Sequence, residues 1–202
     1  MKKTRRKINI LGLIGVLLMV TGSGLIIHDQ VTKYLANKEV KESIDNFFDE
    51  PAVNVGTSPV LADGDVFGTI EMPTVSTVAP IVQSANWDHL EKYVVAWPDR
   101  TLDSGNFSIA GHNGSCASCL FRDIHQLKDG DPILITTREA VYEYKVFKNF
   151  KVHYTDGSVL DDIEDKTTIT LVTCEEAYVG STVRVIIQAE LVSVTPRSGS
   201  PA

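Results

Sequence analysis

The chain has 202 residues, of which 43% are hydrophobic and 22% charged, and its formal net charge at pH 7 is −7. This length and composition are typical of one globular domain with appendages, large enough to bury a core. The acidic balance, with no stripe of lysine and arginine interleaved with aromatic residues, argues against a nucleic-acid partner. The sequence has neither G-x-x-x-x-G-K-[ST] nor G-x-G-x-x-G, so nothing indicates nucleotide binding.

The N-terminus combines a basic leader, MKKTRRK, with twenty uncharged residues from Ile8 to Ile27. Such a stretch is long enough to cross the roughly 30 Å hydrocarbon core of a bilayer. A cleaved signal peptide is the alternative, but its apolar core has about 7–15 residues and ends in an Ala-x-Ala-like site, which TGSGLIIHD does not contain. The pattern therefore favours a membrane anchor over residues 1–30. The basic residues place the N-terminus in the cytoplasm and everything after His28 outside.

Residues 31–65 are predicted to form an extracellular helix and a linker. The apolar stripe of the helix consists of Val40, Ile44, Phe47 and Phe48. Pro51 ends the helix, and AVNVGTSPVLADGD has the Gly, Pro, Ser and Asp content of a linker or irregular turn. The helix is either a stalk or packs on the domain.

Short segments rich in Val, Ile, Thr, Tyr and Phe, bounded by turn residues, follow one another from residue 66 to residue 194. They are VFGTIEM, YVVAW, NFSIAG, PILITT, AVYEYKVFKNFKV, TTITLVT and TVRVIIQAELVSV. So many strands with only short helical stretches predict a closed barrel or a sandwich, because closure removes exposed edges. ITTREAVYEY predicts a hairpin that turns near Arg138 and Glu139. The polar segment 195–202 is predicted to be a flexible tail.

Alternation along these strands places chemically useful side chains away from the apolar face. In NFSIAGH the outward residues are Ser108, Ala110 and His112. In TVRVIIQAEL the alternation puts Arg184 opposite the apolar face, and Cys174 ends the strand before it. Three strand ends could therefore form one site.

A cysteine, a histidine and an arginine together suit acyl transfer from an amide. A nearby cation favours the nucleophilic thiolate, a histidine can protonate the leaving amine, and a guanidinium can donate several hydrogen bonds to an oxyanion. Each residue alone has a plainer interpretation: a packed cysteine, a solvated or salt-bridged arginine and a structural histidine.

The motifs resemble those of the sortases, the cell-surface cysteine transpeptidases of Gram-positive bacteria. The resemblance rests on TLVTC, which ends in Cys174, on VRVI with Arg184, on GNFSIAGH ending in His112, and on LFRDIHQLKDGD. It runs from about Gly68 to Val194 and implies an eight-stranded sortase-type β-barrel over residues 66–194.

The resemblance implies a role for each matching residue. Cys174 would attack the Thr–Gly bond of an LPXTG-like sorting signal and form a thioester. His112 would serve as general acid and then as base, and Arg184 would hold the carbonyl and the oxyanion. Thr173 matches a position that orients substrate and arginine, and Ala110 is a candidate for the groove wall. An amine of the cell wall, from a peptidoglycan precursor or another acceptor, would then resolve the thioester.

Some family features are missing from the sequence. Ala96 stands where many members have a second, non-catalytic histidine. The Asp-Pro-aromatic lid and the C-terminal span of pilin-polymerising sortases are absent, so the chain resembles class A more closely than the pilin-assembling alternative.

Cys116 and Cys119 follow the histidine directly in HNGSCASCLF. Outside the membrane they could form a disulfide, remain two free thiols, or contribute half of a zinc site. A staple for the His112 loop is the plain interpretation, and a redox latch is the sharper one. The pair also supports an alternative function, a membrane-tethered thiol–disulfide oxidoreductase, but that fold needs βαβ units which the strand pattern does not provide. A non-catalytic surface adhesin is a further alternative.

The acidic segment VLDDIED precedes the nucleophile strand. Some class A sortases bind calcium with acidic groups there, and the residues concerned here are Asp161, Asp162, Glu164 and Asp165. A solvated acidic turn is favoured, because no fixed ligand spacing like that of an EF-hand loop is present. No cofactor is expected. The predicted enzyme is a single-pass membrane protein with its catalytic domain outside the cell.

Overall fold

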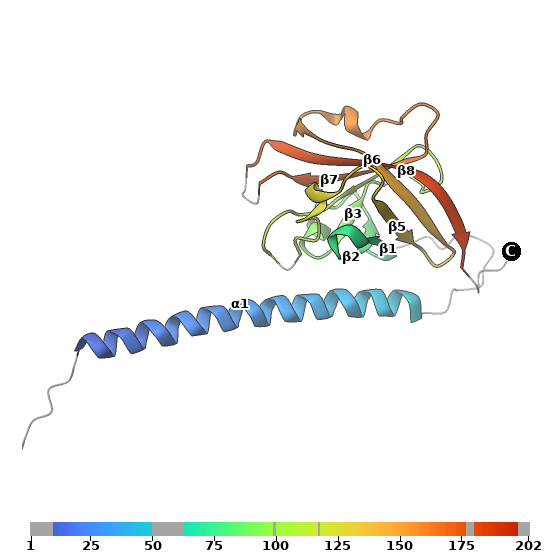
Figure 1. Cartoon of the computed structure of the whole chain (residues 1–202). Helices are drawn as coiled ribbons and strands as arrows, with labels where there is room; N and C mark the ends of the chain where they lie inside the picture. The colour runs from blue at the N-terminus through green and yellow to red at the C-terminus, as the bar shows by residue number, and fades with distance from the viewer. Residues whose placement is uncertain (1–9, 50–62, 99, 117, 177–179, 198–202) are drawn as a thin grey trace, which may run out of the picture.

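A computed structural model describes residues 10–49, 63–98, 100–116, 118–176 and 180–197 of the chain. It contains one long helix and eight strands (Figure 1). The helix is α1 (Ile10–Asp49), and the strands are β1 (Val66–Met72), β2 (Thr77–Gln83), β3 (Val94–Ala96), β4 (Asn106–Ala110), β5 (Pro132–Thr136), β6 (Ala140–His153), β7 (Thr168–Cys174) and β8 (Val183–Pro196). Four 3₁₀ helices lie between strands: η1 (Pro73–Val75), η2 (Trp87–Glu91), η3 (Ile124–Gln126) and η4 (Gly157–Leu160).

The eight strands close into a barrel in the order β1-β2-β3-β4-β7-β8-β6-β5. The predicted closed eight-stranded barrel is therefore confirmed. Most neighbours are antiparallel, but β2 with β3 and β4 with β7 are parallel. A parallel pair needs a crossover connection, and the chain between β4 and β7 forms β5 and β6 on the far side of the barrel.

Alternate residues of the strands fill the barrel interior. The largest fully buried side chains include Phe107, Ile109, Ile169 and Tyr144. The Tyr144 hydroxyl donates a hydrogen bond to the Leu102 carbonyl oxygen at 2.5 Å. A buried phenol needs such a partner, because an unsatisfied hydroxyl in an apolar core is costly. Tyr144 thus places a hydrogen-bonded hydroxyl among the aliphatic and aromatic side chains of the core.

The predicted anchor and the predicted extracellular helix are one continuous helix. α1 runs from Ile10 to Asp49 without a break, although the sequence treats its two halves as separate elements. Among the described residues, α1 is the one helix long and apolar enough to cross a membrane. Pro51, predicted to end the helix, and most of the predicted linker lie outside the described residues.

The second half of α1 packs on the barrel through its apolar stripe. Phe47 is buried, and the other three residues of the stripe are half-buried, so the stripe is confirmed as a packing face. The Arg138 guanidinium donates from Nε to the Phe47 carbonyl oxygen at 3.1 Å and lies 4.7 Å from the Phe47 ring centroid. Lys92 pairs with Glu39 at 2.7 Å, and this contact raises the pKa of the Lys92 ammonium. The helix packs on the domain rather than standing off it as a stalk.

The last strand is longer than the sequence suggests. β8 continues to Pro196, where it pairs with Ala140, so Thr195 and Pro196 belong to the barrel and not to a flexible tail. The backbone N–H of Arg197 then bonds to the Glu139 carbonyl oxygen at 2.9 Å, beside the predicted hairpin turn, which is confirmed. Residues 198–202 lie outside the described part of the chain.

Candidate active site

Three strand ends meet at one end of the barrel. Cys174 is the last residue of β7 and pairs directly with Arg184 at the start of β8. β4 runs parallel to β7, with Ala110 beside Val172, so His112 emerges just beyond β4 at the same end. Because parallel strands end at the same edge, the register brings the histidine next to the strand that carries the thiol. The predicted juxtaposition of Cys174, His112 and Arg184 is what the structure contains.

The three residues line one open groove of about 730 Å³. Its other lining residues are Asn113, Gly114, Ser115, Cys116, Cys119, Tyr154, Glu176, Gly180, Ser181 and Thr182. His112 is exposed and Cys174 is half-buried, so a substrate can reach both.

The Arg184 side chain is held in place by backbone carbonyls. Its Nη1 donates to the Ser181 carbonyl oxygen at 2.8 Å and to the Val183 carbonyl oxygen at 3.3 Å. The guanidinium also lies 5.8 Å from the Tyr154 ring centroid. Two carbonyls use only part of the five-donor fork, so donors remain for a substrate oxygen in the groove. Arg184 therefore supplies a fixed positive charge opposite the thiol.

Hydrogen bonds on both sides of His112 tie its loop to the nucleophile strand. On one side, the Thr173 hydroxyl donates to the Gly111 carbonyl oxygen at 2.7 Å. On the other side, Asn113 Nδ2 donates to the carbonyl oxygens of Cys174 and Glu175 at 2.9 and 3.0 Å. We call these contacts the histidine clamp. Because the clamp joins the residues before and after His112 to those around Cys174, it fixes the spacing of the backbone at His112 and at Cys174.

Gly111 is required by close packing. A Cβ atom there would lie 2.6 Å from the buried ring of Phe121. The Phe121 N–H in turn bonds to the His112 carbonyl oxygen at 3.1 Å. The glycine of the Gly-His pair thus lets the chain pass over Phe121 on its way to the histidine.

The C-x-x-C pair is a disulfide in the groove wall. Cys116 and Cys119 are bonded, with 5.1 Å between their Cα atoms, and both line the groove. Arg122 holds the same loop, donating to the carbonyl oxygens of Gly114 and Cys116. Among the alternatives left open by the sequence, the structure has the disulfide. The pair lies in a loop between β4 and η3 rather than at the start of an α-helix, which removes the basis of the oxidoreductase alternative.

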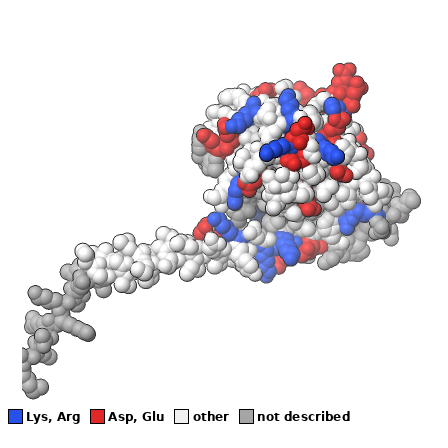
Figure 2. All heavy atoms as spheres, in the orientation of Figure 1, with Lys and Arg blue, Asp and Glu red and all other residues white. Residues whose placement is uncertain are grey.

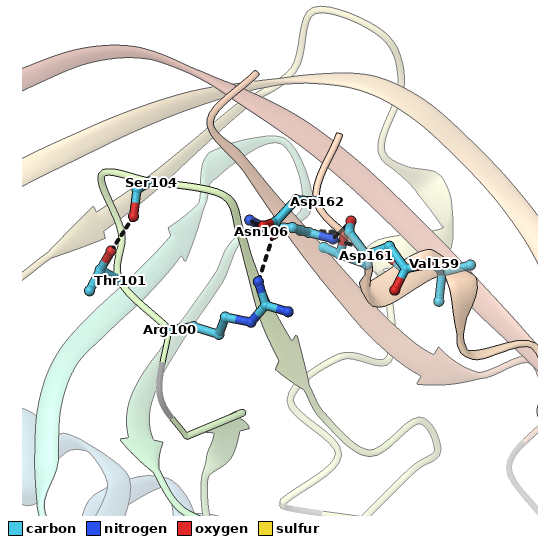
Figure 3. Close-up of polar contacts among 8 residues, drawn as sticks. Arg100, Thr101, Ser104, Asn106, Val159, Asp161 and Asp162 are labelled. Atoms are coloured by element: carbon cyan, nitrogen blue, oxygen red, sulfur yellow. Dashed lines mark hydrogen bonds and ion pairs between the residues drawn. The ribbon is translucent and has the colours of Figure 1, made fainter. Parts of the chain in front are cut away.

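An arginine pairs with one carboxylate of the acidic segment that the sequence links to calcium (Figure 3). Arg100 Nη1 pairs with Asp162 Oδ1 at 2.6 Å, and the same oxygen accepts the Asn106 backbone N–H at 2.9 Å. Asn106 Nδ2 also donates to the carbonyl oxygens of Val159 and Asp161, at 3.1 and 3.0 Å. We call this set of contacts the Asp162 network. In the described part of the chain, no group of three or more His, Cys, Asp or Glu side chains could hold a metal ion.

The two predicted substrate-binding residues, Thr173 and Ala110, are not among the residues that line the groove. Thr173 is buried and directs its hydroxyl to the Gly111 carbonyl. Ala110 is also buried, at the end of β4. Both lie next to the reacting residues in sequence, but their side chains contact protein in this structure.

Asn113, Tyr154 and Ser181 are groove residues that the sequence pattern does not predict. Asn113 could have been suspected, because it follows His112 directly and carries an amide that can donate twice. Tyr154 and Ser181 had no sequence signal. Tyr154 reaches Arg184 because His153 pairs with Val183 across β6 and β8, whereas Ser181 contacts it from the adjoining loop.

Taken together, the groove defines an enzyme of thiol-dependent acyl transfer. A free cysteine, a histidine held beside it and an arginine with spare donors are the groups needed to attack a carbonyl, protonate a leaving amine and hold an oxyanion. An adhesin would not require this set.

Comparison with known proteins agrees with this class. A model of the sortase domain matches residues 70–192, and the chain therefore belongs to the sortase family, the cysteine transpeptidases. It is 29% identical over 186 residues to sortase A of Bacillus anthracis, covering 83% of this chain and 88% of that protein.

Solved sortase structures have the same fold. The sortase A structure of Listeria monocytogenes superposes with a TM-score of 0.61 at 29% identity, over 66% of this chain and 91% of that chain. A Clostridium perfringens sortase D5 transpeptidase gives a TM-score of 0.64 at 26% identity, over 76% and 98% of the two chains. The features of this chain are closest to class A.

Proposed function

We propose that the enzyme cleaves an LPXTG-like sorting signal between Thr and Gly and transfers the released protein to an amine of the cell wall. The observation that carries this proposal is the direct pairing of Cys174 with Arg184 at the groove, with His112 clamped beside them. As a sortase, the enzyme acts on surface proteins that carry a sorting signal. The sequence preference and the acceptor are the proposed part.

The first half-reaction forms a thioester. The Cys174 thiolate attacks the carbonyl carbon of the Thr residue, and a C–S bond forms while the carbonyl oxygen becomes an oxyanion. The free donors of Arg184 stabilise that oxyanion. As the oxyanion collapses, the C–N bond to Gly breaks, and the departing nitrogen takes a proton from the His112 imidazolium.

The second half-reaction reverses these roles. An incoming amine attacks the thioester carbon and gives its proton to neutral His112. The new amide bond forms, the C–S bond breaks, and Cys174 leaves as the thiolate. Water in place of the amine would give hydrolysis, so the two outcomes differ only in the nucleophile that reaches the groove.

We also propose that α1 anchors the enzyme by a single span, with the N-terminus in the cytoplasm and the barrel outside. The uncharged stretch in the first half of α1 and the basic leader before it support this topology. Figure 2 supports it as well, because the described charged side chains lie on the barrel and the adjoining part of α1, and the free part of α1 has none. No calcium is needed in this proposal, because Arg100 already balances Asp162.

Mass spectrometry of the full chain in detergent tests the proposal. The enzyme is incubated with a Leu-Pro-Glu-Thr-Gly peptide and a glycine-based amine, beside Cys174→Ala as control. We expect a thioester adduct on Cys174 and an amine-ligated peptide, both missing from the control. Absence of both products from the wild-type reaction, in a sample that remains folded, would contradict the proposed specificity.

The same assay separates a disulfide staple from a redox latch. We propose the staple, since the hydrogen bonds of the histidine clamp involve neither sulfur atom of the disulfide. Added reductant should leave the yield of ligated peptide unchanged. A large change in yield between reducing and oxidising conditions would favour the latch.

A further inference from the structure

The first half of α1 is free of the barrel, while the second half is docked on it. Large apolar side chains of the first half are strongly exposed, among them Leu11 at 82% and Leu25 at 73%. Phe47, near the other end of the helix, is buried. An apolar helix surface of this kind is stable in lipid, not in water. Because the helix is continuous, the docked half fixes the direction in which the barrel meets the bilayer.

Contacts along α1 show which end of the barrel lies toward the free half. Lys33 and Asn37 border a cleft whose other lining includes the disulfide, Cys116 and Cys119. The disulfide also lines the active-site groove. Phe47, fourteen residues further along α1, instead contacts Arg138 in the turn between β5 and β6. The loop that carries Cys116 and Cys119 therefore lies next to the part of α1 around Lys33 and Asn37.

Strand register shows that the two contacts are at opposite ends of the barrel. β6 begins after the Arg138 turn at Ala140, which pairs with Pro196, and ends at His153, which pairs with Val183 next to Arg184. Figure 1 shows the same arrangement: α1 runs along the barrel, and its free half projects past the end where β7 stops and β8 starts. The groove is thus at the end of the barrel that lies toward the apolar half of α1.

Helix geometry gives the height of each end above the apolar segment. Six residues separate Ile27, the last of the uncharged stretch, from Lys33, which corresponds to about 9 Å at 1.5 Å per residue. Phe47 is twenty residues beyond Ile27, or about 30 Å. The interfacial layer of a bilayer is roughly 5–8 Å thick on each side. The groove end is therefore just beyond the headgroups, and the β5–β6 turn is far above them.

We propose that the end of the barrel formed by residues 112–116, 118–119 and 180–182 faces the bilayer surface, with the active-site groove toward the headgroups. The docked half of α1 acts as a rigid spacer that sets this distance. The inference rests on the anchor in the proposed function. Its partner is the lipid surface itself.

Fluorescence quenching on vesicles measures this orientation directly. In a Cys174→Ala background, whose two remaining cysteines are joined in the disulfide, Thr182→Cys and Glu139→Cys each carry one fluorophore on an exposed residue. Thr182 lines the groove, and Glu139 is in the turn at the opposite end. The full chain is reconstituted in phosphatidylcholine–phosphatidylglycerol vesicles containing a lipid with a headgroup-attached quencher.

We expect at least about threefold stronger quenching at position 182 than at position 139, because the two ends differ in height by about 20 Å. Insertion of seven alanines after Asp29 should weaken quenching at position 182, since it lifts the barrel by about 10 Å while nearly keeping the helical phase. Equal quenching at the two positions, stronger quenching at position 139, or quenching at neither in vesicles that carry the protein would overturn the proposal.

Two further measurements separate this outcome from a failure of the proposed function. If the protein does not float with the vesicles, the proposed membrane anchoring by α1 is wrong, and the proposed orientation of the barrel is wrong as well. The wild-type chain in the same vesicles can ligate a soluble Leu-Pro-Glu-Thr-Gly peptide even if quenching is equal at positions 182 and 139. That result would support the proposed transpeptidation and overturn only the proposed orientation.

Discussion

At the scale of single residues, the histidine clamp is the feature that a list of catalytic groups omits. Thr173 and Asn113 are not among the three predicted reacting groups, yet their hydrogen bonds join the two chain segments that supply the imidazole and the thiol. Arg184, by contrast, is fixed by carbonyls of its own strand and loop. The site thus has two independently supported parts, and substitutions should separate them.

Asn113→Ala should slow transpeptidation with little effect on folding. We expect kcat/KM to fall about tenfold, equivalent to about 1.4 kcal/mol, because the residue after His112 loses both hydrogen bonds to the Cys174 strand. The alkylation rate of Cys174 and its pH profile should change as well, which a merely structural role would not cause.

Asn149→Ala is the matched control and should behave as the wild type, because it also removes an amide that donates to two carbonyl oxygens, those of His125 and Leu127, but away from the groove. An Asn113→Ala enzyme with unchanged kcat/KM and unchanged alkylation kinetics would show that the clamp does not position the histidine.

At the scale of elements, the Asp162 network holds the loop between β6 and β7 to the start of β4. Asp162 should contribute more to stability than Arg100, although the two form one ion pair. Removing Arg100 breaks an exposed ion pair worth about 0–1 kcal/mol. Removing Asp162 also leaves the partly buried Asn106 N–H without its acceptor, which costs about 1–3 kcal/mol.

Urea unfolding of Arg100→Ala and Asp162→Ala measures the difference. Equal stability of the two variants would argue against this account of the network.

The transpeptidation rate of the wild type should be the same with added calcium and with a chelator, since the Arg100 guanidinium already neutralises the Asp162 carboxylate. Activation by calcium would argue against the proposed independence from metal.

The strands could be predicted from sequence because β-branched and aromatic runs between turn residues are a local signal. The continuity of α1 was missed for an equally physical reason. Its first half has an uncharged composition and its second half an amphipathic stripe, so the two were treated as different elements although no helix breaker separates them. The disulfide could not be decided from sequence, because a spacing of three residues is compatible with bonded and with free cysteines.

The site was predictable where it depends on strand ends and not where it depends on loops. Cys174, His112 and Arg184 follow from alternation and motif, whereas Asn113 acts through a contact 61 residues away in sequence. Thr173 is on the core-facing side of β7 together with Leu171, which explains why its hydroxyl contacts a backbone carbonyl and not the groove. The contacts made by these side chains depend on the tertiary structure, which the sequence pattern does not encode locally.

At the scale of the whole molecule, Tyr144 makes the barrel sensitive to alkali. Burial raises the pKa of its phenol well above the ordinary value of 10.0. The folded chain therefore keeps the neutral phenol, so the stability it contributes is fully present below pH 10 and is lost as pH rises above that value. We expect the wild type to lose up to about 1.4 kcal/mol per pH unit from this residue.

Tyr144→Phe should remove that part of the alkaline slope, at a cost of about 1 kcal/mol at pH 7 for the lost hydrogen bond to Leu102. Urea midpoints measured between pH 8 and pH 11 give both quantities. Tyr142→Phe, which alters a half-buried phenol, is the control and should change the slope less. Identical slopes in wild type and Tyr144→Phe would place the alkaline sensitivity elsewhere.

The parallel pairing of β4 with β7 also determines when the active site forms during folding. Gly111 and Thr173, which are hydrogen-bonded across this pair, are 62 residues apart in sequence. The chain between them includes β5 and β6. Non-local pairing of this kind is formed late and slowly in folding, on a scale of milliseconds to seconds. The groove that brings Cys174, His112 and Arg184 together therefore exists only once the barrel has closed.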